Sequence, residues 1–435
     1  MLFRFRTERG RAAFAVLSVA GLGAALILIV TLVQLQHPTV INLTPALSGQ
    51  TERCLTCHNG IEPISPSHSI AEFGCVSCHS GDALAIDQQA AHTGMVANPG
   101  SLDYAQQYCG DCHAAQVLLV ERSIMTTYAG AITLIRRAYG LQPSDQAEYS
   151  AHAIGDLQGF APAPDDPQPV HDFAANCLTC HTTAEPLQAE YHYRSTGCST
   201  CHVLYDADGL YEGGDPTISK SEPGHSQTHT FTVAIPYTQC NHCHNRGNYD
   251  LRTMTFLPRA DMPADLPLTG EALRLHDYYQ PIGQFTRCEY ELDCVDCHTQ
   301  QEIMGDGVLH NNRSEAQYTQ CKTCHGTLDA PPAEQIVRSN DELAMTRANL
   351  NPLVDLSVGD TIMVTERGEP LYNVRRVDGE WVLTGKATGE QYTIPLVQGS
   401  TCTQDVTRQD SASCHECHSV DRDALMSELL AAAAP

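Results

Sequence analysis

Nine copies of the motif Cys-x-x-Cys-His account for eighteen of the twenty cysteines in this 435-residue chain. Composition alone predicts fewer than one such motif in a chain of this length. Two thiols at this spacing can each bond one haem, and the histidine that follows then ligates the iron. The motifs therefore predict nine covalently attached haem c groups. Their cysteines are Cys54, Cys57, Cys75, Cys78, Cys109, Cys112, Cys177, Cys180, Cys198, Cys201, Cys240, Cys243, Cys294, Cys297, Cys321, Cys324, Cys414 and Cys417.

The histidine that ends each motif is the predicted proximal iron ligand. These residues are His58, His79, His113, His181, His202, His244, His298, His325 and His418. Zinc is the alternative occupant, because paired Cys-x-x-Cys units also build zinc sites. A zinc site gives no reason for histidine to follow the second cysteine in all nine copies, so the pattern favours haem.

Twelve further histidines decide whether each iron has a second protein ligand. A haem with one protein ligand can bind small molecules, whereas a haem with two is usually confined to electron transfer. His37 follows an apolar segment, and His242 and His415 lie inside motifs, which leaves nine histidines for nine irons. The predicted distal ligands are His68, His92, His152, His171, His192, His225, His229, His276 and His310. The alternative replaces one or two of them by His415, Met95, Met304 or Met345.

An internal repeat relates residues 54–79 to residues 177–202. Both begin with CLTCH, both carry Glu-Pro and a glycine at matching offsets, and both place a second motif 21 residues after the first. A looser copy covers residues 294–325. Each copy holds one histidine between its two motifs, namely His68, His192 and His310. We interpret these three residues as equivalent iron ligands, and the sequence leaves open which iron each one holds.

The spacing of the motifs predicts three modules of three haems each. They cover residues 38–160, 161–285 and 286–435, and the last contains a β-rich insertion at residues 353–400. Within the insertion, residues 355–398 alternate β-branched or aromatic runs with turns such as Asp378-Gly379, which predicts four or five antiparallel strands. Residues 114–140 read as one long helix.

The N-terminal residues 1–37 are predicted to anchor the chain in a membrane. Residues 12–36 carry no charge, and this uncharged stretch is long enough to form a transmembrane helix. Four arginines precede this segment, so the positive-inside rule predicts a single pass through the inner membrane, a cytoplasmic N-terminus and a periplasmic haem domain. A cleaved signal peptide is the alternative.

Net charge and the two remaining cysteines add limits on partners and redox chemistry. A formal charge of −26 excludes nucleic acid as a favoured partner and suits a basic redox protein. Other predicted partners are a quinol-linked donor and subunits of a membrane complex. Cys288 and Cys402 could form a disulfide, stay free or act at a redox site.

The nine motifs from Cys54 to His418 resemble those of multihaem c-type cytochromes from respiring bacteria. Residues 81–113, then SIMTTYAG at 123–130 and LYNVRRVDGEWVLTGK at 371–386, look like blocks of octahaem tetrathionate-reductase-like cytochromes. The resemblance implies an extracytoplasmic electron conduit with His92 as a distal ligand. No Cys-x-x-Cys-Lys motif marks a catalytic haem as in related reductases.

Together these observations predict short α-helices and loops around covalently bound haems, with an N-terminal transmembrane helix and a small antiparallel β-rich insertion. The predicted function is electron relay by a membrane-anchored nonahaem cytochrome, without catalytic residues. The alternatives are an oxidoreductase acting on a nitrogen or sulfur oxyanion at one open haem, and a haem subunit of a larger membrane complex or filament.

Overall fold

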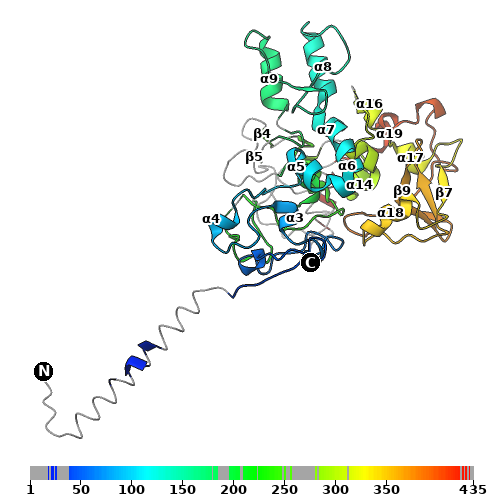
Figure 1. Ribbon diagram of the computed structural model, residues 1–435. Helices are drawn as coiled ribbons and strands as arrows, with labels where there is room; N and C mark the ends of the chain where they lie inside the picture. The colour runs from blue at the N-terminus through cyan, green and yellow to red at the C-terminus, as the bar shows by residue number, and fades with distance from the viewer. Residues whose placement is uncertain are drawn as a thin grey trace, which may run out of the picture. The chain divides into compact units, whose positions relative to one another are not determined.

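The computed structural model gives the fold of the main part of the chain (Figure 1). It describes residues 39–178, 180–184, 195–205, 209–222, 224–246, 249–250, 255–256, 280–281, 284–310 and 313–421, with single residues or short pieces in 18–26 and 424–431. The predicted ligands His192 and His276 lie outside the described residues.

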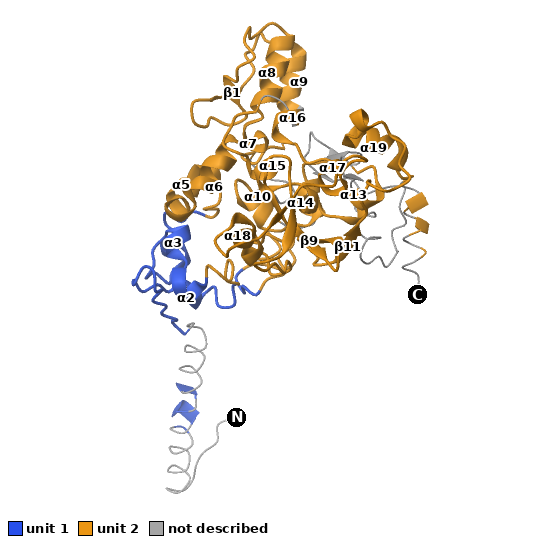
Figure 2. Ribbon diagram, turned by 90° about the vertical axis from the view of Figure 1, so that its right-hand side faces the viewer, with its two compact units in different colours: residues 1–61, 69–96, 214–217 blue, residues 62–68, 97–213, 218–435 orange. Residues whose placement is uncertain are grey.

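The chain forms two compact units, which Figure 2 colours blue and orange. The first consists of residues 1–61, 69–96 and 214–217, and the second of residues 62–68, 97–213 and 218–435. The described elements of the first unit are the 3-10 turn η1 (Cys54–Thr56) and the helices α2 (Ile70–Phe73), α3 (Val76–His79) and α4 (Gln88–Ala91). The division into three haem modules remains a prediction.

The second unit consists mainly of short helices joined by loops. Its helical elements are α5 (Leu102–Tyr108), α6 (Gly110–Arg122), α7 (Ile124–Thr127), α8 (Ala129–Ala138), α9 (Gln168–Cys177), α10 (Ser199–His202), α11 (Tyr237–Asn241), α13 (Arg287–Glu291), α14 (Cys294–Cys297), α15 (Gln300–Met304), α16 (Arg313–Ala316), α17 (Cys321–His325), α18 (Leu343–Leu350), η2 (Val406–Arg408) and α19 (Ser411–His418). Its two-residue strands are β1 (Tyr149–Ser150), β2 (Gln158–Gly159), β3 (Asn245–Arg246), β4 (Tyr249–Asp250), β5 (Thr255–Phe256) and β6 (Gln280–Pro281).

The single long helix predicted over residues 114–140 is wrong, because two residues interrupt it. Ser123 has extended backbone angles, and its hydroxyl accepts a hydrogen bond from Thr126 N–H as the N-cap of α7. Tyr128 has the left-handed angles φ 50° and ψ 17° and ends that helix after one turn. Serine competes with helical hydrogen bonding in this way because its side chain can satisfy the backbone locally.

A five-stranded antiparallel sheet forms the β-rich insertion. Its order is β11 (Gln391–Ile394), β10 (Glu380–Thr384), β9 (Pro370–Val377), β8 (Thr361–Val364) and β7 (Glu334–Ile336). Asp378 and Gly379 both have positive φ and turn β9 into β10, as their residue types predict. The strand β7 begins before the predicted insertion at 353–400, which shows that the insertion is longer than predicted.

Alternating side chains of the sheet build two apolar cores. Ile362 packs with Val337 and Met345 of α18, while its neighbour Met363 packs on the other face with Trp381. Successive residues of a strand point to opposite faces, so a single strand contributes to both cores. Figure 1 shows α18 beside this sheet. The sheet therefore has a packed core of its own that needs no haem.

The predicted membrane-spanning helix over residues 12–36 lies mostly outside the described residues. Among the residues that the structure describes, no helix is both long and apolar enough to cross a membrane. The longest, α6, has 13 residues and spans about 20 Å, against about 30 Å for the hydrocarbon layer. By this finding the predicted fold class, which included a transmembrane helix, and the predicted inner-membrane location are wrong.

Candidate functional site

Most of the motifs fold into one helical turn with a shared hydrogen bond. The N–H of the motif histidine donates to the carbonyl of the first cysteine, as in His58 to Cys54 (3.0 Å) and His113 to Cys109 (2.8 Å). Residues i, i+3 and i+4 of a helical turn lie on one face. Both thiols and the imidazole therefore lie on the same side of the turn, as one haem requires. The same bond is made by His79, His202, His244 and His298.

Six motif histidines are held by a hydrogen bond at Nδ1. Four bond a neutral oxygen and two bond a carboxylate. The partners are Val96 O for His79 (2.8 Å), Thr183 Oγ1 for His181 (2.7 Å), Thr232 O for His202 (2.7 Å), Pro395 O for His325 (2.7 Å), Asp215 Oδ2 for His58 (2.6 Å) and Glu302 Oε2 for His298 (3.3 Å). A hydrogen bond at Nδ1 fixes the ring and its tautomer and directs Nε2 toward a metal. These imidazoles thus have the support of metal-ligating histidines.

Two predicted distal histidines lie opposite motif histidines. The rings of His58 and His92 have centroids 6.1 Å apart, and those of His68 and His113 are 6.0 Å apart. Two metal–nitrogen bonds of about 2 Å, with half a ring on each side, put the centroids of a bis-histidine pair roughly 6 Å apart. Both separations therefore fit an iron between the rings. The motifs are numbered 1 to 9 along the chain. His68, which lies between motifs 1 and 2, is thus placed against His113 of motif 3.

The surroundings of His68 suit an iron ligand. Its Nδ1 lies 2.9 Å from Ser65 Oγ and 3.1 Å from Ser67 Oγ. The backbone N–H of His68 donates to the carbonyl of Ser65. Burial and the neighbouring His113 lower the pKa of His68, which keeps the ring neutral. His229 is held in the same manner, with Nδ1 3.0 Å from Glu62 O.

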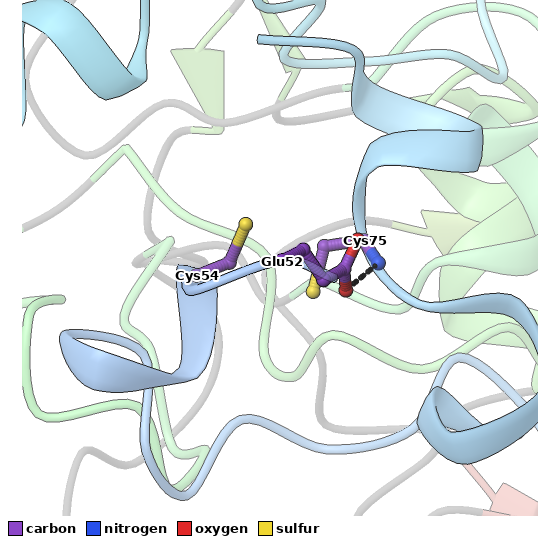
Figure 3. A group of neighbouring side chains, drawn as sticks. All are labelled: Glu52, Cys54 and Cys75. Atoms are coloured by element: carbon purple, nitrogen blue, oxygen red, sulfur yellow. Dashed lines mark hydrogen bonds between the residues drawn. The ribbon is translucent and has the colours of Figure 1, made fainter. Parts of the chain in front are cut away.

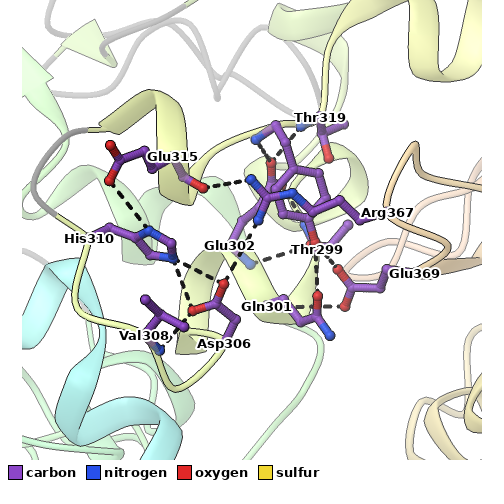
Figure 4. Close-up of polar contacts among 11 residues, drawn as sticks. Thr299, Gln301, Glu302, Asp306, Val308, His310, Glu315, Thr319, Arg367 and Glu369 are labelled. Atoms are coloured by element: carbon purple, nitrogen blue, oxygen red, sulfur yellow. Dashed lines mark hydrogen bonds and ion pairs between the residues drawn. The ribbon is translucent and has the colours of Figure 1, made fainter.

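The structure places other predicted ligands differently. His310 has Nε2 3.0 Å from both carboxylate oxygens of Asp306 and Nδ1 3.7 Å from Glu315 (Figure 4). His152 has Nε2 3.3 Å from an exposed carboxylate of Asp103. These two rings face carboxylates through the nitrogen that would bind iron. His171 lies on α9 and His225 in a loop, and their ligand roles remain predictions.

The two motif histidines left out of the ligand set also have other partners. His242 Nε2 lies 3.3 Å from Tyr205 O, with the ring stacked on that tyrosine, and His415 Nε2 lies 3.2 Å from Glu289. Sequence reasoning missed Asp215, which lies 157 positions from His58 and has no local signal. It also missed Glu302, although the i,i+4 spacing from His298 is a local signal that could have found it. The structure leaves Cys288 and Cys402 as separate thiols.

The first two motifs are joined through a buried carboxylate, as Figure 3 shows. Glu52 accepts hydrogen bonds from Cys75 N–H (2.7 Å) and Val76 N–H (3.1 Å). Its ligand atom and the thiols of Cys54 and Cys75 all lie within 4.8 Å of one another, so the three could reach one metal ion. Thioether bonds to two haems would use both thiols, which favours haem attachment over a metal site here.

Glu52→Ala is expected to reduce the free energy of unfolding by about 2 kcal/mol, because it leaves two half-buried N–H groups without a charged acceptor. Chemical denaturation followed by circular dichroism measures the change. Glu72→Ala, at a carboxylate of α2, is the control, and its effect should be smaller. Equal losses in the two variants would contradict the bridging role of Glu52.

The second copy of the repeat lacks this bridge, since Ala175 stands where the first copy has Glu52. Cys198 N–H instead donates to Gly100 O (2.8 Å), just before the helix that leads to motif 3. Asn98 Nδ2 donates to Ser195 Oγ, Thr196 O and Thr196 Oγ1 at 3.0–3.2 Å, and its Oδ1 accepts from Ser199 Oγ. Cys109 and Cys198 pack on one apolar cluster. Motif 5 is thus joined to motif 3.

Later motifs are paired in the same way. Tyr237 N–H donates to Asp293 Oδ1 (2.7 Å) where α11 of motif 6 packs on α14 of motif 7. Cys321 N–H donates to Ser411 Oγ (3.0 Å) where α17 of motif 8 packs on α19 of motif 9. The pKa of the Cys240 thiol is raised mainly by its hydrogen bond with Cys294, and to a smaller extent by burial. The first cysteines of paired motifs therefore lie side by side.

Comparisons with known proteins find no protein family, curated protein or solved structure that matches this chain. The resemblance to multihaem cytochromes therefore rests on the sequence motifs and blocks alone.

Proposed function

We propose that this chain is a nonahaem c-type cytochrome that relays single electrons between redox partners. The observation that carries the proposal is the pair of ring separations, His58–His92 and His68–His113, each about the distance that an iron between them requires. Random placement gives no reason for a motif histidine and a predicted distal histidine to meet twice at this distance.

The chain's own residues would hold and insulate the haems. The cysteines of each motif would hold the haem edge and the motif histidine the iron, while His92 and His68 would close the sixth position at motifs 1 and 3. When bound, haem iron supplies the one-electron chemistry. Two histidine ligands exclude exogenous ligands from the iron, which favours electron transfer over catalysis.

The pairing of motifs supports transfer along the chain. Motifs 1 and 2, 3 and 5, 6 and 7, and 8 and 9 each adjoin. Burial, and then the nearby thiol of Cys324 in motif 8, raise the pKa of Cys297 in motif 7, as expected where these two motifs lie close together. Haems attached to adjoining motifs would lie close together. The acidic composition, at −26 formal charge, suits a basic protein as one redox partner.

The alternative function, catalysis at one open haem, has its support at motif 4. The ring that lies against its histidine His181 is Tyr128, with centroids 6.3 Å apart and planes tilted by 60°. Tyr128 has left-handed backbone angles, which are strained for a tyrosine and are a recurrent feature of functional sites. An open haem at this motif, acting on a nitrogen or sulfur oxyanion, is the second candidate function.

The protein purified with its haems should carry nine covalently bound haem groups. Mass spectrometry of the denatured protein and the pyridine haemochrome absorbance each give this number. Electron paramagnetic resonance of the oxidised protein should show low-spin haems, with at most one high-spin signal. Fewer than two bound haems, or zinc in their place, would exclude the electron-relay function.

A further inference from the structure

The motif histidines differ in the charge of the group at Nδ1. His79, His181, His202 and His325 bond a carbonyl or hydroxyl oxygen, whereas His58 and His298 bond a carboxylate. A carboxylate at Nδ1 draws the ring proton and makes the imidazole a more basic, more electron-donating ligand. A more donating ligand favours ferric over ferrous iron. The haems at these two motifs would therefore be harder to reduce.

Asp215 is positioned at His58 by a distant part of the chain. Its carboxylate is 1% exposed, and its Oδ2 lies 2.6 Å from His58 Nδ1. Its Oδ1 accepts hydrogen bonds from the N–H and hydroxyl of Thr217, both at 2.8 Å. The two Thr217 donors, together with His58, stabilise the charged form of this buried carboxylate.

Glu302 has the corresponding position at His298. Its side chain is 2% exposed, Oε2 lies 3.3 Å from His298 Nδ1, and Oε1 accepts from Tyr318 N–H and Thr319 N–H at 2.6 Å. Figure 4 shows Glu302 directed toward Thr319. The two backbone donors stabilise the charged form of this buried carboxylate.

We propose that Asp215 and Glu302 are redox-tuning residues that make the haems of motifs 1 and 7 harder to reduce than those of motifs 2, 4, 5 and 8, whose histidines bond neutral oxygens. This inference rests on the proposed function, because it requires haem at both motifs. Neither carboxylate contacts the iron, so each acts as a positioning residue through the imidazole that it bonds.

Asp215→Asn and Glu302→Gln test the proposal in the full-length holoprotein. Each amide keeps an oxygen for the Nδ1 proton but removes the charge. In a spectroelectrochemical titration, one haem in nine should become at least tenfold easier to reduce, a rise of about 59 mV for a one-electron couple. Asp405→Asn, at an exposed carboxylate that caps η2, is the matched control and should leave all nine potentials unchanged.

A second variant separates tuning from packing. Thr217→Val removes a hydroxyl that donates to Asp215 and also lies 3.1 Å from His58 Nδ1. The Nδ1 proton is then left to a carboxylate that is a stronger acceptor, so the same haem should become harder to reduce. Shifts of opposite sign in Asp215→Asn and Thr217→Val are expected. Nine bound haems with no shift, or shifts of equal sign, would overturn the tuning role. Fewer than two bound haems in the unaltered protein would instead overturn the proposed function.

Discussion

Replacing His68 by alanine is expected to convert one haem in nine, the haem at motif 3, from low-spin to high-spin. The ring of His68 lies 6.0 Å from that of His113, and serine hydroxyls hold its Nδ1. Alanine supplies no ligand, so His113 would be the one protein ligand left on that iron. Electron paramagnetic resonance should show the loss of one low-spin signal and the gain of one high-spin signal, with nine haems still bound.

His152→Ala is the control for this change. His152 was also predicted as a distal ligand, but its Nε2 faces Asp103. Its removal should leave every haem low-spin. A high-spin signal in His152→Ala, with none in His68→Ala, would show that the ring separations do not identify the ligands. His92→Ala should repeat the His68 result at motif 1, because His92 lies opposite His58.

Gly197→Ala is expected to lower the free energy of unfolding by about 3 kcal/mol. Gly197 has φ +64°, and a Cβ added there would lie 2.1 Å from Gly100 O and 2.7 Å from Ser101 Cα. The backbone around Gly100 would have to move, which breaks its hydrogen bond with Cys198 N–H. Chemical denaturation measures the loss. The magnetic coupling between the haems of motifs 3 and 5 should weaken at the same time.

Gly94→Ala measures how much of the loss in stability comes from the left-handed backbone alone, without a steric clash. Gly94 has a similar φ, +73°, but an added Cβ would meet no atom within 4 Å. Its cost should be about 1 kcal/mol, from the left-handed backbone alone. Equal losses in the two variants would mean that the close contact between motif 5 and the segment before motif 3 contributes nothing to stability.

Local patterns were the part of this molecule that could be predicted. Alternation between residues 355 and 398 indicated strands, and Asp378-Gly379 indicated the turn between β9 and β10, because both signals depend on neighbouring residues only. The same locality explains a failure. Ser123 and Tyr128 lie within a run of helix-compatible residues, and nothing nearby in the sequence shows that one of them caps a new helix and the other adopts left-handed angles.

The internal repeat shows the limit of predicting contacts from local sequence. Residues 54–79 and 177–202 look equivalent, which suggests that motif 4 pairs with motif 5 as motif 1 pairs with motif 2. The exchange of Glu52 for Ala175 removes the acceptor for the second motif's first N–H. That N–H is then satisfied by Gly100, so motif 5 adjoins motif 3 in addition to Thr182 after motif 4, whose carbonyl accepts from Gly197 N–H. One side chain outside the motif thus changes the acceptor of the first cysteine's N–H.

The sequence by itself determined the number of motifs, the thiols and imidazole within each, and the set of histidines that could complete them. These features depend on residues three or four positions apart, which one helical turn brings together. Only the tertiary structure decided that His68 faces His113, that His92 faces His58, and that Asp215 reaches His58 from 157 positions away. Such contacts depend on how distant segments pack, because no local spacing encodes which imidazole a buried carboxylate or a second histidine will meet.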